Sequence, residues 1–125
     1  MTKLSTFLSL LLIIVLASCA TKTPVWTPVG NWDYTVTDTP NGDGYGTIFI
    51  TEENSTLKAV LRSPEYGDSD ITNLTISEGQ LKGDLSLAGL DMMISGTFEG
   101  EVLTGAVDAG QYGLFPLNAT RQAEE

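Results

Sequence analysis

From residue 30 onward, apolar and polar residues alternate with a period of two, and turn-forming residues interrupt the alternation at short intervals. This pattern is typical of antiparallel strands with one buried face and one solvated face. All 13 glycines lie in this region, which shows no amphipathic helical spacing. The alternation predicts eight strands, over residues 30–38, 46–52, 56–63, 71–77, 80–88, 92–99, 102–108 and 113–121.

An internal repeat indicates how these strands are connected. Residues 51–59, 77–83 and 98–105 each combine the end of a strand, an acidic turn and the motif Leu-x-small. Three such hairpins between a first and a last strand predict an up-and-down meander, and eight meandering strands lose their exposed edges by closing into a barrel. We therefore expect an all-β domain over residues 30–121, a small eight-stranded antiparallel up-and-down β-barrel, followed by a tail over residues 122–125.

The first 18 residues have the features of a secretory signal peptide. Lys3 supplies a positive charge, residues 7–16 form an apolar run, and small residues follow. The run is too short for a spanning helix, which needs about 20 apolar residues. Leu16-Ala17-Ser18-Cys19 resembles the lipobox of bacterial lipoproteins, which implies cleavage before Cys19 and its acylation, with palmitate as an expected acyl group. The alternative is an ordinary signal peptide beside an unrelated cysteine.

The lipobox resemblance implies a lipid anchor in the bacterial cell envelope. Several acyl chains on Cys19 would anchor the protein stably, whereas a single chain binds a bilayer only marginally. In the lipoprotein family an Asp after the cysteine favours retention in the inner membrane, so Ala20 favours the outer membrane. Residues 19–29 are then the lipidated N-terminus and a short tether, which two prolines keep extended. Trp26 in this tether can rest at the lipid interface or pack on the barrel, and we expect packing.

Composition excludes several kinds of site. The chain has no histidine, and Cys19 is its only cysteine, which excludes Ser-His-Asp and Cys-His catalysis, His-ligated zinc and an intrachain disulfide. Removal of residues 1–18 leaves five basic and 16 acidic residues, a formal net charge of −11, which repels nucleic acid. The loop at residues 38–44 lacks the full spacing and the bidentate Glu of a calcium loop. We expect no enzymatic activity, no cofactor, no metal and no nucleic-acid partner.

The two ends of the barrel domain carry a second resemblance. Gly30-Asn31-Trp32 opens the first strand and Arg121 closes the last, and this signature resembles that of lipocalins, fatty-acid-binding proteins and avidins. The resemblance implies that Arg121 stacks over Trp32 at one end of the barrel, a contact worth about 0.5–2 kcal/mol. The strands are shorter than those of lipocalins, the chain lacks their helix, and the tryptophans of an avidin site are absent.

The barrel interior is the first candidate site. An eight-stranded barrel is either filled by side chains or holds one small ligand. A ligand of this interior would be lipidic or aromatic, because the inward residues are apolar, and Tyr34 would orient it. The expected lining residues are Tyr34, Leu61, Leu85, Ile94, Phe98 and Phe115.

The sequence leaves two functions open. The first is a non-enzymatic binding module for a small apolar ligand or lipid. The alternative is an accessory or interaction lipoprotein with a side-chain-filled barrel that docks a protein or glycan partner in the envelope. The candidate docking surfaces are the loop at residues 64–70 and outward-facing apolar residues, namely Phe49, Val60, Met93 and Leu114.

Overall fold

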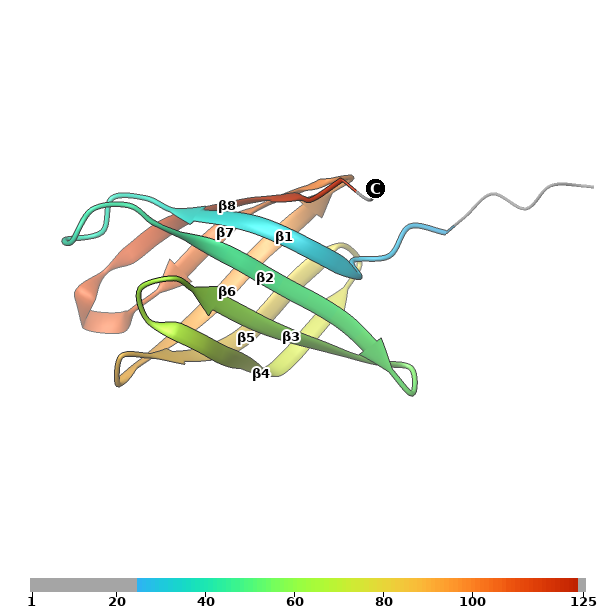
Figure 1. The fold of residues 1–125 in the computed structure, drawn as a ribbon, viewed down its shortest axis with the longest axis horizontal. Coiled ribbons are helices and arrows are strands. Elements are labelled where there is room, and N and C mark those ends of the chain that lie inside the picture. Colours follow the sequence, from blue (N-terminus) through green and yellow to red (C-terminus); the bar gives the residue numbers. More distant parts are fainter. Residues whose placement is uncertain (1–24, 124–125) are drawn as a thin grey trace, which may run out of the picture.

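The alternating residues form eight antiparallel strands that close into a barrel (Figure 1). The computed structural model describes residues 25–123, so the signal peptide and Cys19 lie outside the described residues. Each strand pairs with the next along the chain, and β1 also pairs with β8. The strands are β1 (Gly30–Val36), β2 (Gly44–Glu53), β3 (Thr56–Ser63), β4 (Gly67–Ser77), β5 (Gln80–Leu87), β6 (Leu90–Glu99), β7 (Val102–Asp108) and β8 (Leu114–Arg121). The expected all-β class and up-and-down barrel are confirmed.

Helix is almost absent from this part of the chain. A single 3-10 turn, η1 (Gly110–Tyr112), lies between β7 and β8. Within residues 25–123, no helix has the length and apolar character needed to cross a membrane.

Two-residue turns join three strand pairs at one end of the barrel. They are Asn54-Ser55, Glu78-Gly79 and Gly100-Glu101, which connect the hairpins predicted from the repeat. Both residues of the first two turns have positive φ, and such turns match the right-handed twist of paired strands. We call this end the closed end, and Figure 1 shows residues 25–29 leaving the barrel there.

The opposite end, which we call the open end, carries the other four connections. These are the β1–β2, β3–β4 and β5–β6 connections and the β7–β8 connection that contains η1. In Figure 1 the β1–β2 connection lies at the far side of the barrel from residues 25–29. The up-and-down order therefore separates the tether from the open end by the length of the barrel.

Strand β4 differs from the predicted strand at its start and in its middle. It begins at Gly67, four residues earlier than predicted, so only Pro64–Tyr66 connect it to β3. One extra residue is inserted opposite β5, and Asn73 within this bulge has a φ of 51°. The bulge allows both Ile71 and Leu74 to face the core. Strict alternation from Leu74 would place Ile71 on the outer face, and this expectation fails because of the bulge.

The core fills the barrel from the closed end. Its fully buried side chains are Trp32, Ile48, Ile50, Leu61, Leu81, Ile94, Leu103 and Leu117. Gly96 and Gly105 face each other on β6 and β7, and a Cβ on Gly105 would collide with the backbone of β6. The Leu103 side chain occupies the space that a side chain at Gly96 would need. These glycines let neighbouring strands and large side chains approach closely in a narrow barrel.

Candidate ligand-binding cavity

Trp32 and Arg121 close one end of the barrel. Trp32 is fully buried, and its ring centroid lies 4.9 Å from that of Phe98. The indole N–H of Trp32 donates a hydrogen bond to the carbonyl oxygen of Pro28 at 2.9 Å. The guanidinium carbon of Arg121 lies 4.7 Å from the Trp32 ring centroid. The structure thus contains the stack that the lipocalin resemblance implies.

Arg121 also fastens the segment before β1 to the barrel. Its Nη1 donates to the carbonyl oxygens of Thr27 and Val29, both at 2.7 Å. Its Nε donates to the Glu101 carboxylate at 2.5 Å, while the Arg121 side chain is only 12% exposed. Through these contacts the Arg121 side chain joins the tether, the β6–β7 turn and β8. The contacts are strong, because hydrogen bonds that involve a charged group are stronger than neutral ones.

Trp26 completes the closed end from the tether. Its ring centroid lies 5.4 Å from that of Phe98, and its indole N–H donates to the Gly100 carbonyl at 3.1 Å. Trp26 therefore packs on the barrel end, as expected, although part of its ring stays exposed.

The open end of the barrel contains a cavity of about 420 Å³. Small-molecule sites in proteins have volumes of roughly 300–1,000 Å³ and mainly apolar linings. All four connections at the open end contribute to the rim. The large apolar side chains of the lining are Val36, Leu61, Leu85, Leu87, Leu90, Met92, Val107 and Phe115. The barrel is therefore filled at one end and hollow at the other.

Tyr34 is the least exposed polar residue of the cavity lining. It follows Trp32 on the inward face of β1, and its residue surface is only 6% exposed. Its hydroxyl lies 3.5 Å from the carbonyl oxygen of Arg62, at the limit of a hydrogen bond. Burial raises the pKa of the Tyr34 hydroxyl, and a hydrogen bond with Ser63 opposes this shift. At neutral pH the hydroxyl is uncharged and can donate or accept a hydrogen bond.

The structure brings together four of the six side chains that were expected to line the interior. Tyr34, Leu61, Leu85 and Phe115 line the cavity. Ile94 and Phe98 do not lie among the lining residues, although both face inward and are buried. Phe98 packs against Trp32 and Trp26 at the closed end, and Ile94 belongs to the fully buried core.

Three exposed tyrosines at the rim were not among the expected lining residues. Tyr45, Tyr66 and Tyr112 are 67%, 48% and 58% exposed and line the cavity together with Tyr34. All four tyrosines of the chain therefore line one cavity. The rim tyrosines lie in or beside three connections. An up-and-down strand order places these connections at the same end of the barrel, so the sequence could have indicated that the three tyrosines lie at one end.

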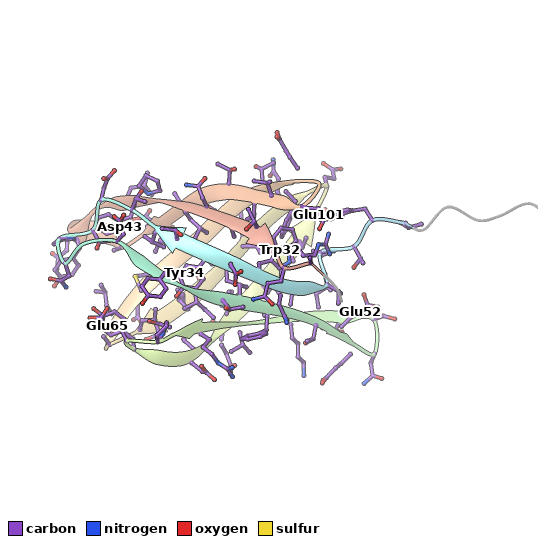
Figure 2. The ribbon with its side chains drawn as sticks, turned by 45° about the horizontal axis from the view of Figure 1, so that its top comes forward. Trp32, Tyr34, Asp43, Glu52, Glu65 and Glu101 are labelled. Carbon is purple, nitrogen blue, oxygen red and sulfur yellow. The ribbon has the colours of Figure 1, made fainter. Side chains whose placement is uncertain are left out.

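The charged side chains at the cavity are acidic. Asp43 and Glu65 line it, and within the described residues no lysine or arginine does. Figure 2 shows Tyr34, Asp43 and Glu65 toward one end of the barrel and Trp32 and Glu101 toward the other. The open end therefore combines an apolar interior with an aromatic and acidic rim.

The loop at residues 38–44 contains hydrogen bonds between its own residues. The Asp43 carboxylate accepts a hydrogen bond from the backbone N–H of Asp38 at 3.4 Å, and the Thr39 hydroxyl donates to the Gly42 carbonyl. In the part of the chain that the structure describes, no three acidic, histidine or cysteine side chains are grouped so that they could hold a metal ion.

The outward apolar residues divide into two groups. Phe49 and Val60 face each other on β2 and β3 and are half-buried, and the Arg62 guanidinium lies 4.8 Å from the Phe49 ring centroid. Met93 and Leu114 are 58% and 66% exposed and both pair with Asp108 on β7. The more exposed apolar surface thus lies on β6 and β8.

No model of a known protein family matches the chain, and no curated protein matches it in sequence. The cavity and its rim are therefore the basis for a functional proposal.

Proposed function

We propose that this protein is a bacterial cell-envelope lipoprotein whose barrel binds one small apolar molecule, such as a lipid, at its open end. The observation that carries the proposal is the cavity of about 420 Å³, because its volume and apolar lining are those of small-molecule sites. The buried Tyr34 hydroxyl in its lining would give a bound molecule one polar contact. The lipobox resemblance at residues 16–19 supports a lipid anchor, and Ala20 supports the outer membrane.

The chemistry of the lining favours binding over catalysis. Its buried polar side chains are the hydroxyls of Tyr34 and Ser63. Ser63 already accepts hydrogen bonds from the backbone N–H groups of Glu65 and Tyr66. The chain has no histidine to activate either hydroxyl as a nucleophile. These groups support a non-enzymatic role.

Native mass spectrometry with organic extraction of the purified protein tests the proposal. Leu85→Trp enlarges a lining side chain, and Met93→Trp places the same ring on the outer surface as a matched control. We expect an apolar molecule to co-purify with the original protein and with Met93→Trp but not with Leu85→Trp. Equal retention by Leu85→Trp would place the ligand outside the cavity, and absence from every sample would count against the proposal.

A second candidate function is docking of an envelope protein. The exposed side chains of Met93 and Leu114, which both pair with Asp108, favour this alternative. A photo-cross-linking residue at position 93 should then capture the same envelope protein repeatedly. The same probe at Lys58, which also points outward, is the control. Equal capture at both positions would argue against a specific surface on β6 and β8.

A further inference from the structure

We infer that the cavity takes an apolar cation, an alkyl- or arylammonium, in preference to a fatty acid or another apolar anion. The inference rests on the proposed function, because it assigns a charge to the ligand of the same cavity. It follows from the rim tyrosines, from the sign of the charged groups at the opening and from the positions of the basic residues.

The aromatic rim is the first observation. Tyr45 lies at the start of β2, whereas Tyr66 and Tyr112 lie in the β3–β4 and β7–β8 connections, and each remains about half exposed or more while it lines the opening. Aromatic rings usually bury their surface, so three exposed rings around one cavity are available to a ligand. The face of an aromatic ring carries negative potential and attracts ammonium groups, which is how aromatic side chains recognise quaternary amines.

The charged groups at the opening are the second observation. Asp43 and Glu65 contribute carboxylates to the lining, from the β1–β2 and β3–β4 connections. A cation at the rim would gain attraction from both. A carboxylate or phosphate would be repelled by both, and it would lose hydration without gaining a basic partner.

The basic residues of the described part are the third observation, because none lines the cavity. Lys58 pairs with Glu53 at 2.9 Å, and Arg62 points outward to Asp68 at 3.0 Å. Arg121 is held at the closed end by its carbonyl and carboxylate partners. Lys82 occupies an exposed outward position on β5. An anionic ligand would therefore meet no compensating charge.

The interior determines the other half of the ligand. Below the rim the lining consists mainly of aliphatic and aromatic side chains, and the Tyr34 hydroxyl among them is buried and uncharged. A charged group would be costly there, whereas a hydrocarbon or aryl group would be stabilised by burial. The arrangement fits a molecule whose apolar part enters the barrel and whose ammonium group stays at the rim.

Three probes with a shared apolar part test the sign of the ligand charge. They are (4-phenylbutyl)trimethylammonium, 5-phenylpentanol and 5-phenylpentanoate. The full chain is carried in nanodiscs of an uncharged galactolipid, empty nanodiscs serve as the blank, and affinities are measured by calorimetry. We expect the ammonium probe to bind at least about tenfold more tightly than the carboxylate, which corresponds to about 1.4 kcal/mol, with the alcohol between them.

Matched charge variants locate the effect. Glu65→Gln removes a rim carboxylate and should weaken the ammonium probe about threefold or more without weakening the alcohol. Glu52→Gln makes the same change toward the closed end (Figure 2) and should leave both affinities unchanged, because salt screens charges beyond about 8 Å.

The outcomes separate the two proposals. Binding of the alcohol and the carboxylate as tightly as the ammonium probe would overturn the inference while leaving an apolar binding site in place. Equal weakening by Glu65→Gln and Glu52→Gln would also overturn it, because the preference would then reflect net charge alone. Failure of all three probes to bind would overturn the proposed function together with the inference.

Discussion

The ring of Tyr34 lies over Gly46, its partner on the neighbouring strand β2. A Cβ on Gly46 would stand 2.7 Å from the Tyr34 hydroxyl oxygen and would collide with the carbonyl oxygen of Arg62. The tyrosine ring can therefore take this position in the cavity lining because β2 has no side chain at Gly46. An aromatic ring that covers a glycine on the adjacent strand also shields the backbone there.

We predict that Gly46→Ala destabilises the protein by about 1–3 kcal/mol, because the added methyl group must displace Tyr34 or the backbone of β3. Gly44→Ala is the matched control, since a Cβ there would meet no atom within 4 Å. Urea denaturation of both variants measures the difference. Equal stability of the two alanine variants would contradict the close packing of Tyr34 on Gly46.

The raised pKa of Tyr34 makes stability depend on pH in the alkaline range. The folded protein keeps the Tyr34 proton to higher pH than the unfolded chain, in which tyrosine loses its proton near pH 10. The associated stability is fully present below about pH 10 and is lost as pH rises through the folded-state pKa. Tyr34→Phe should reduce this loss. Urea denaturation of both proteins between about pH 8 and pH 11 measures the slope, and an unchanged slope in Tyr34→Phe would contradict this prediction.

Arg121→Met should destabilise the protein by about 2–4 kcal/mol, because it removes charged hydrogen bonds and leaves the carbonyl oxygens of Thr27 and Val29 without this donor. It should also loosen residues 25–29, so that Trp26 becomes more accessible to a fluorescence quencher. Arg62→Met removes an exposed guanidinium and should cost less. An Arg121→Met loss no larger than that of Arg62→Met would show that the closed end does not depend on this side chain.

Cys19→Ser tests the lipid anchor. The change should move the protein from the membrane fraction to the soluble envelope fraction, since the acyl chains would have no attachment point. Fractionation of envelopes followed by detection of the chain measures the distribution. Ser18→Ala preserves a small residue before the cysteine and should leave the protein on the membrane. A Cys19→Ser protein that stays on the membrane would contradict the lipobox interpretation.

The sequence predicted the strands well because alternation reports which face each residue occupies. It was wrong for β4, where the inserted residue at Asn73 shifts the alternation and turns Ile71 inward. A bulge depends on how β4 pairs with β5, and neither strand alone contains that information. The start of β4 at Gly67 was missed for the same reason, since its pairing with Ser63 on β3 defines it.

The site was less predictable, because alternation does not say how deep an inward residue lies along the barrel axis. Leu85 and Ile94 both occupy inward positions in the alternation, yet Leu85 lines the cavity and Ile94 lies in the filled part of the barrel. Depth is set by the stagger between neighbouring strands, a property of the closed barrel. The rim tyrosines were missed because Tyr45 and Tyr112 line one cavity only when segments distant in sequence converge.

The attachment of the tether at the closed end has a consequence for molecular exchange. A lipid on Cys19 would hold the closed end toward the bilayer, with only residues 19–24 between the lipid and the described segment, a span of at most about 20 Å. The opening would then face away from the membrane that carries the protein. Ligands would arrive and depart through the aqueous compartment, and a molecule dissolved in that same membrane would have to desorb before the barrel could capture it.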